Sequence, residues 1–326
     1  MKKKQLRKRW LLIFVPLIWL GIHSSTVTAY VDMVKKGEAQ PAFTVDELHE
    51  RIAKESEARA QKPINARVDR VWKAIPGYNG RVVDREATYR IASKQKLSHP
   101  NPWIYREIPP KVGLDDLSPS PIYRGNEKKS MVALMINVAW GTEHLSKMLS
   151  TLKQEHVRVT FFLDGSWLKK HETEARAILA EGHEIGNHAY THPMMSRLDR
   201  GRMDKEIRQT ESLIRRLGTR SRFFAPPGGD FNQMTVDVAH DLGMKTVMWT
   251  VDTVDWRKTS SPAWMISRVR KGVGNGTLIL MHPTDRTAIA LPQIIRTVKQ
   301  KGIKLGTVAE VLSSKRIDPV ESKGAF

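Results

Sequence analysis

Residues 131–138 read Met-Val-Ala-Leu-Met-Ile-Asn-Val, a run that is apolar except for the asparagine near its end. A strand with one solvated face would alternate apolar and polar residues, whereas this run is apolar on both sides of the backbone. Strands that are buried on both faces are typical of parallel sheets covered by helices. The run therefore predicts a central strand of a parallel sheet.

The residues that follow repeat this pattern of a short apolar strand and then a helix. The expected strands are 159–163, 223–224, 246–251 and 277–281, and the expected helices are 144–155, 168–180, 202–217, 234–242, 263–271 and 289–301. Their alternation predicts an α/β fold with parallel strands, either a closed barrel or an open doubly wound sheet. In both architectures ligands bind at the carboxyl ends of the strands.

The chain before residue 129 has a different character. A helix is expected to begin at Thr44, because Thr44 and Glu47 match a capping box, and to end before Pro63. Turn-forming residues at 75–80 and several prolines within 109–129 predict a small accessory module and an extended linker. The expected divisions are an export segment at 1–29, the accessory module and linker at 30–128, the main domain at 129–316 and a tail at 317–326.

The amino terminus has the pattern of an export signal. Lys and Arg occupy positions 2–4 and 7–9, and an apolar run follows at residues 10–22. Val27 and Ala29 are small residues at the −3 and −1 positions of a cleavage site. We expect either a signal peptide cleaved after Ala29 or an anchor retained at residues 10–22. In both cases the rest of the chain is expected outside the cell, in the envelope or with the spore.

Composition narrows the partners and the kinds of metal site. With 54 Lys and Arg against 34 Asp and Glu, the chain carries a formal charge of +20, which favours an anionic wall polymer or membrane surface. Basic and acidic residues are interleaved and no nucleic-acid-binding motif is present, so no nucleic-acid partner is expected. The chain has no Cys, so any metal must be held by His and carboxylate side chains.

Polar residues stand just past the ends of the expected strands. Because the carboxyl ends of parallel strands share one rim, these residues are expected to converge there as a site. They are Asn137, Asp164, His188, His192, Asp252, Asp255 and His282.

His188 and His192 are the strongest metal candidates. They lie four residues apart across a strand end and a tight turn, in Gly-Asn-His-Ala-Tyr-Thr-His-Pro at 186–193. Two imidazoles, one carboxylate and a water form the open arrangement of catalytic zinc sites. The sequence therefore predicts a zinc-like divalent metal, with Asp164 as a tentative third ligand and Glu143 as a weaker alternative.

Five sequence elements occur in an order that resembles a known family. They are Val159–Phe162, His188–Pro193, Pro226–Gly228, Asp252–Trp256 and Leu280–His282. In this order they resemble the motifs of the NodB-homology polysaccharide deacetylases, carbohydrate esterase family four, over residues 131–314. The resemblance implies a distorted (β/α) barrel, a divalent metal and removal of acetyl groups from N-acetylated sugars.

The same resemblance implies roles for individual residues. By motif position, His282 would be the acid that protonates the leaving amine, with Asp255 or Asp252 as the carboxylate that orients it. Trp256, Pro226 and Pro227 would line the sugar pocket.

The first motif departs from the family pattern. Where the family has Thr-Phe-Asp-Asp-Gly, this chain has Met-Ile-Asn-Val-Ala-Trp-Gly at 135–141. Alignment on the strand puts Asn137 in place of the base and Val138 in place of the metal ligand, whereas alignment on the glycine puts Ala139 and Trp140 there. None of these side chains is a carboxylate, and an amide does not accept a proton near neutral pH.

A second departure accompanies the first. Ala225 stands where the family has the arginine before its proline pair. Loss of both the arginine and the aspartate indicates that the site was remodelled, because losing only one member of a buried ion pair would leave an uncompensated charge.

These features predict one of three functions. The first is metal-dependent hydrolysis of acetamide bonds on N-acetylated wall or spore glycan, with weak activity. The second is a glycan-binding pseudoenzyme that keeps the metal-site histidines, and the third is a cationic protein of wall or membrane adhesion whose barrel is only a scaffold. The export segment, the accessory module and the altered first motif together resemble the YlxY-type, sporulation-associated branch of bacterial deacetylases.

Overall fold

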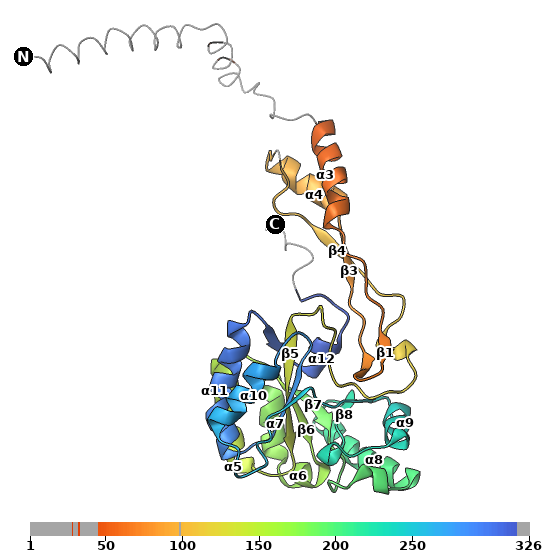
Figure 1. Ribbon diagram of the computed structural model, residues 1–326, viewed down its shortest axis with the longest axis vertical. Helices are drawn as coiled ribbons and strands as arrows, with labels where there is room; N and C mark the ends of the chain where they lie inside the picture. Colours follow the sequence, from red (N-terminus) through yellow and green to blue (C-terminus); the bar gives the residue numbers. More distant parts are fainter. Residues whose placement is uncertain (1–27, 29–31, 33–44, 98, 318–326) are drawn as a thin grey trace, which may run out of the picture. The chain divides into compact units, whose positions relative to one another are not determined.

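The computed structural model describes Thr28, Asp32, residues 45–97 and residues 99–317 (Figure 1). Apart from Thr28, the expected export segment lies outside the described residues, and so does the capping residue Thr44. None of the helices in these described ranges combines the length and the apolar character needed to span a membrane.

The described chain divides into two compact units. The smaller comprises residues 45–60, 82–97 and 99–105, and the larger comprises 61–81 and 106–317. In the smaller unit, helices α3 (Val45–Arg59) and α4 (Arg85–Lys94) bury Leu48, Ile52 and Ala92 between them. Two pairs of short strands precede the main domain, β1 (Arg67–Asp69) with β2 (Lys73–Ile75) and β3 (Gly80–Val83) with β4 (Tyr105–Ile108).

The larger unit is built on a parallel sheet, as the apolar strands predict. Its order is β10-β11-β5-β6-β7-β8-β9, with β12 paired to β5, and every pairing is parallel. The strands are β5 (Met131–Val138), β6 (Thr160–Leu163), β7 (Glu184–Asn187), β8 (Phe223–Phe224), β9 (Lys245–Thr246), β10 (Val251–Asp252), β11 (Leu278–Met281) and β12 (Lys304–Gly306).

The two edges of this sheet belong to one stretch of chain. The backbone N–H of Val247 still donates to Phe224 at 2.8 Å, on the β8 side, whereas that of Thr250 donates to Leu278 at 2.9 Å, on the β11 side. The strand predicted at 246–251 is therefore two short strands, because the chain changes partner halfway along. The two edge strands β9 and β10 are thus consecutive in the chain, and the expected distorted (β/α) barrel is confirmed.

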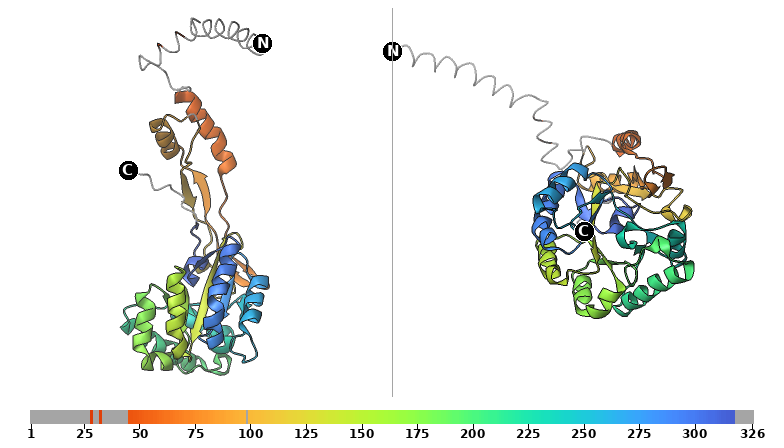
Figure 2. Two further views of the ribbon diagram at one scale, coloured as in Figure 1. Left: turned by 90° about the vertical axis from the view of Figure 1, so that its left-hand side faces the viewer. Right: turned by 60° about the horizontal axis from the view of Figure 1, so that its bottom comes forward.

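Helices surround the strands, as the right-hand view of Figure 2 shows. The stretch predicted as one helix at 168–180 is two, which meet at His171 with φ −128°. The helices are α5 (Thr142–Gln154), α6 (Gly165–Lys170), α7 (Glu172–Ala180), α8 (Arg200–Arg216), α9 (Gln233–Asp241), α10 (Pro262–Gly272), α11 (Asp285–Gln300) and α12 (Val308–Leu312), with short 3-10 turns at Leu114–Asp116, Met195–Arg197 and Pro227–Gly229.

Alternate residues of β5 face two different cores. Val132, Leu134, Ile136 and Val138 belong to the cluster shared with the surrounding helices. Ala133 and Met135 belong to the cluster inside the barrel, together with Phe162 and Leu278. Because side chains alternate along a strand, this division determines which residues at the carboxyl ends point toward the site.

The proline-containing segment predicted as a linker contributes to the larger unit. Ile122 is buried there, and its backbone N–H donates to Thr246 at 2.9 Å. Its carbonyl accepts from Met248 at 2.8 Å, so this extended segment adds backbone hydrogen bonds at the point where β9 leaves β8.

Candidate active site at the carboxyl ends of the strands

The alternation along the strands brings the predicted polar residues to one end of the barrel. Asn137 follows Met135 by two positions on β5 and so shares the interior face. Asp164 has the same relation to Phe162, and His282 lies four positions after Leu278. The predicted convergence thus follows from the period of two and from parallel strand directions.

His188 and His192 lie next to each other in the loop after β7. Their ring centroids are 5.1 Å apart, with the ring planes at 73°. His188 Nδ1 lies 2.7 Å from the carbonyl oxygen of Ala225, and because a carbonyl only accepts, Nδ1 carries the proton. This tautomer leaves His188 Nε2 with a free lone pair.

Both imidazoles are held in the neutral form. Burial, together with the smaller effect of the neighbouring His192, lowers the pKa of His188 to about 3. Burial also lowers the pKa of His192, although the charge of Asp164 opposes this shift. Neutral imidazole is the form that binds metal, so the pair is suited to ligation near neutral pH.

One carboxylate oxygen of Asp164 caps a helix, and the other is available to a ligand. Its Oδ1 accepts from the backbone N–H of Trp167 at 2.9 Å and from the Ser166 hydroxyl at 2.6 Å, which caps α6. Its Oδ2 is buried and has no hydrogen-bond partner among the described residues. Burial raises the pKa of Asp164, against the opposing effect of the Ser166 hydrogen bond.

The donor set fits a divalent metal in part. Two neutral imidazoles and an unpartnered carboxylate oxygen are the chemistry that a zinc-like ion requires. Across residues 45–97 and 99–317, however, no group of three or more His, Asp or Glu side chains is placed to hold a metal. The described residues thus bring the two histidines together but place no third ligand beside them.

Asp255 is the carboxylate that contacts His282. The Nδ1 atom of His282 lies 2.8 Å from Asp255 Oδ1, and the His282 backbone N–H donates to Asp255 Oδ2 at 2.6 Å. The Thr287 hydroxyl also donates to Oδ2, at 2.6 Å, and the Asp255 side chain is fully buried. Asp252, the other candidate, accepts instead from the backbone N–H of Val254 at 2.7 Å.

Asn137 lies on the interior face of β5, near the end of the strand. It is 3% exposed, and its Oδ1 has no hydrogen-bond partner within the described chain. Val138 is fully buried on the opposite face, against the helices, while Trp140 is 45% exposed. Of the residues considered from the two alignments, only Asn137 is on the interior face of β5.

Trp140 lies over the acid candidate. Its ring and that of His282 are nearly parallel, at 8°, with centroids 5.8 Å apart. Gly141 follows with φ 80°, and a Cβ there would lie 1.9 Å from the carbonyl oxygen of Pro283. This close backbone approach joins the altered first motif to the segment that carries His282.

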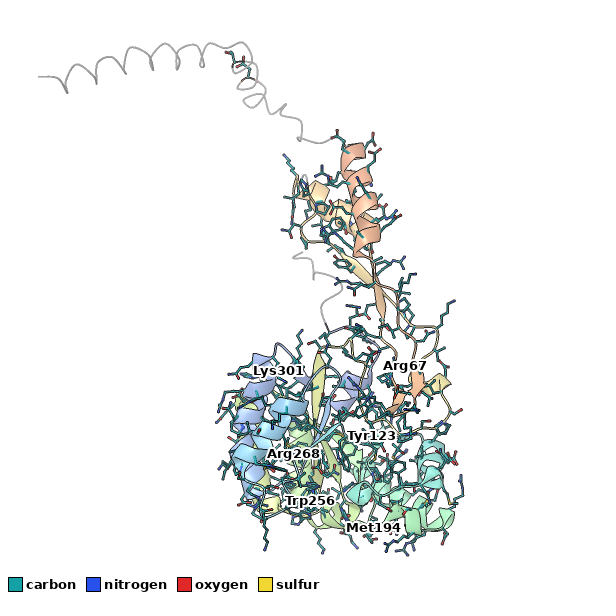
Figure 3. The ribbon with its side chains drawn as sticks, in the orientation of Figure 1. Arg67, Tyr123, Met194, Trp256, Arg268 and Lys301 are labelled. Carbon is teal, nitrogen blue, oxygen red and sulfur yellow. The ribbon has the colours of Figure 1, made fainter. Side chains whose placement is uncertain are left out.

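The remaining predicted residues differ in exposure. Trp256 is 49% exposed, with the Arg257 guanidinium 4.8 Å from its ring centroid, whereas Pro226 and Pro227 are buried. Figure 3 labels Trp256 and Met194 toward the same end of the larger unit. The side chain of Glu143 is 72% exposed and lies 3.5 Å from His144.

Two residues of this region were not predicted from the sequence. Thr287 carries no motif signal, because its contact with Asp255 arises only when α11 packs beside β11. Glu206 did carry a signal, since it is an acid on the buried face of α8 beside Met203 and Ile207. An acid within an apolar stripe indicates a specific buried hydrogen-bond partner.

Comparison with known proteins agrees with this geometry. The polysaccharide deacetylase family model matches residues 124–247. The chain is 43% identical to the uncharacterized protein YlxY of Bacillus subtilis, over 88% of this chain and 90% of that one. It is 32% identical to a peptidoglycan-N-acetylglucosamine deacetylase of Bacillus cereus, over 60% of this chain and 72% of that one.

The similarity extends to the three-dimensional structure of a solved protein. The crystal structure of a Bacillus anthracis protein described as a family 4 pseudoenzyme has a TM-score of 0.77 and 43% identity, covering 83% of this chain and 96% of that one. A mutant of that protein described as having restored enzymatic activity has the same TM-score, with 41% identity over 82% of this chain and 99% of that one. Together with the motif order and the barrel, these matches establish that the chain belongs to the polysaccharide deacetylase family, carbohydrate esterase family 4.

Proposed function

We propose that this protein acts on N-acetylated polysaccharide of the cell wall or spore and slowly hydrolyses its acetamide groups. The observation that carries the proposal is the buried Asp255 holding His282 through two hydrogen bonds. A carboxylate that orients an imidazole and stabilises its protonated form is the arrangement of a general acid. In this reaction water adds to the acetamide carbonyl, the C–N bond breaks, and acetate and a free amine are formed.

Each residue of the site has a different proposed role in this reaction. His188 and His192 would hold a divalent metal, and Asp164 would become its third ligand only if Oδ2 moves toward the pair, because the described residues form no three-ligand group. When bound, the metal would polarise the carbonyl and activate water. Because Asp255 engages Nδ1 of His282, Nε2 of the imidazolium is the atom that protonates the leaving amine. The amide of Asn137 cannot take the proton of water, which is why we propose slow turnover.

A second candidate is a glycan-binding protein without turnover. The observation that favours it is the pair Asn137 and Val138, an amide where the base belongs and an apolar side chain turned to the helices. The Bacillus anthracis relative described as a pseudoenzyme supports this candidate as well. Here the half-exposed Trp140 and Trp256 would retain the sugar chain while no acetate is released.

The setting follows from the amino terminus and the charge. We propose that the protein is exported, either cleaved after Ala29 or anchored by residues 10–22, and works in the cell envelope or with the spore. The net charge of +20 would hold it near anionic wall polymer or a membrane surface.

Acetate release decides between the two candidates. Full-length protein loaded with zinc is incubated with N-acetylated chitooligomers, and acetate is measured for the wild type, His282→Asn and Asn137→Asp. We expect slow release by the wild type, loss in His282→Asn and faster release in Asn137→Asp, since the aspartate restores a base on the interior face.

The opposite pattern would reject the hydrolase. If the wild type releases no acetate and retains the oligomers on an affinity gel, the protein is a glycan-binding pseudoenzyme. Zinc content measured on the same samples shows whether a lack of acetate reflects a missing metal or a missing base. Asn137→Leu is the control variant, because it removes the amide without supplying a carboxylate.

A further inference from the structure

A buried glutamate on α8 holds the loop between the two metal-candidate histidines. Glu206 is 1% exposed. Its Oε2 accepts the backbone N–H groups of Tyr190 at 3.0 Å and Thr191 at 2.7 Å, and its Oε1 accepts the Thr191 hydroxyl at 2.9 Å. Three donors from the loop thus converge on one carboxylate.

This carboxylate lies in an unfavourable place for a charge. It is on the apolar face of α8, beside the fully buried Met203 and Ile207, and the guanidinium of the half-exposed Arg202 lies 3.2 Å from Oε1. A buried carboxylate is tolerated only when hydrogen bonds replace its hydration. The loop donors supply that replacement, so the glutamate and the loop conformation depend on each other.

The loop itself is strained and lacks regular structure. Ala189 has φ 60° and His192 has φ 56°, both in the left-handed region that side chains with a Cβ seldom adopt. Such a conformation persists where surrounding contacts impose it. Two further contacts come from α8, because Thr210 Oγ1 donates to the Ala189 carbonyl at 2.7 Å and the Ile207 carbonyl accepts from Asn187 Nδ2 at 2.9 Å.

We propose that Glu206 is a positioning residue that sets the relative placement of His188 and His192 and so their affinity for a divalent cation. The proposal rests on the proposed function, because it assigns the cation to this pair. Without the carboxylate, the N–H groups of Tyr190 and Thr191 lose their acceptor, and the turn between the histidines is free to relax. Outer-shell groups that hydrogen-bond the metal-ligating side chains themselves change metal affinity by about 10- to 100-fold when they are removed. Glu206 acts through the loop backbone, so we expect an effect at the lower end of this range.

The chain provides a matched control on the same helix. Glu211 is 8% exposed, and it accepts from the backbone N–H of Ser221 at 3.3 Å and from Arg215 Nε at 3.3 Å. It therefore also holds a loop, but at the amino end of β8, away from the histidines. Glu206→Leu and Glu211→Leu both remove a buried carboxylate from α8, and only the first touches the histidine loop.

The test measures zinc binding and the histidines themselves. Full-length wild type, Glu206→Leu, Glu206→Gln and Glu211→Leu are titrated with zinc by calorimetry, and the imidazole resonances of His188 and His192 are recorded by NMR without metal. We expect Glu206→Leu to weaken zinc binding by about tenfold and to shift or broaden both resonances. Glu206→Gln should stay near the wild type, because its amide oxygen still accepts the two N–H groups, and Glu211→Leu should change neither measurement.

The outcomes separate this inference from the proposed function. Wild-type affinity and unshifted resonances in Glu206→Leu would overturn the positioning role, and so would an equal loss in Glu211→Leu, which would indicate general destabilisation. If the wild type binds no zinc, the proposed metal site fails, while the metal-free NMR comparison still decides the role of Glu206. If Glu206→Leu does not fold, Thr191→Val removes only the hydroxyl donor and should give a smaller shift in the same two resonances.

Discussion

Asp255 holds His282 at two points, by a side-chain contact of 2.8 Å to Nδ1 and by the His282 backbone N–H at 2.6 Å. The first contact orients the ring, and the second fixes the backbone just past the end of β11. Since the Thr287 hydroxyl donates to the same carboxylate at 2.6 Å, this one side chain joins the loop after β10, the end of β11 and the start of α11.

Removal of this carboxylate should destabilise the larger unit. We expect Asp255→Ala to lower the free energy of unfolding by about 3 kcal/mol, because it leaves the His282 N–H and the Thr287 hydroxyl without their acceptor. Urea denaturation followed by circular dichroism measures the change. Asp285→Ala is the control, since that side chain is 60% exposed, and an equal loss in both variants would contradict the assignment.

The close approach of Gly141 to Pro283 gives a second prediction. Gly141→Ala should destabilise the protein by about 2 kcal/mol or more, because the new Cβ would lie 1.9 Å from a backbone oxygen at a φ of 80°. The midpoint of thermal unfolding should fall accordingly. At Gly274 a Cβ meets no heavy atom within 4 Å, so Gly274→Ala should leave the midpoint nearly unchanged. Similar effects at both positions would show that the approach is not tight.

Burial of His183 predicts a loss of stability in acid. Burial, together with the smaller effect of the Arg158 charge, lowers its pKa to about 4, whereas the unfolded value is near 6.5. Between these two values the unfolded chain binds the extra proton, so the stability that His183 contributes is lost as the pH falls from about 6.5 to about 4.

The measurement is the free energy of unfolding at several pH values in this window. His183→Gln keeps an acceptor for the Val159 N–H, which now donates to Nδ1 at 3.2 Å, but does not titrate. The slope should therefore decrease by up to about 1.4 kcal/mol per pH unit relative to the wild type. An unchanged slope in His183→Gln would contradict the prediction.

Trp140 should contribute to glycan binding more than to stability. Its indole is 45% exposed beside His282, and an aromatic face that remains accessible offers a stacking surface to a sugar ring. We expect Trp140→Ala to weaken binding of N-acetylated chitotetraose by about tenfold in calorimetry, with little change in unfolding. Trp264→Ala removes a tryptophan of similar exposure, 42%, from α10 and should bind as the wild type does. Equal binding by all three proteins would exclude this role.

Local pattern was enough to predict much of the fold and the candidate site. The apolar runs and the helical spacing predicted parallel strands alternating with helices, because both depend on residues close together in the chain. Position at the strand ends predicted which polar side chains meet at one rim. The structure places Asp164, His188 and His282 directly after their strands and Asn137 at the last residue but one of β5.

What could not be predicted depends on contacts between distant segments. The strand expected at 246–251 is divided because its two halves pair with β8 and β11, which no local pattern records. The choice of Asp255 over Asp252 as partner of His282 likewise follows from the turn after β10 and from the packing of α11.

By itself the sequence determined the alternation of strands and helices, the pair of histidines and the absence of a carboxylate from the first motif. Only the tertiary structure decided that Asn137 lies on the interior face while Val138 packs against the helices, and that Glu206 holds the loop between the histidines. The physical reason is that side-chain type and spacing are local properties. Hydrogen bonding and burial depend on which elements pack together when the barrel closes.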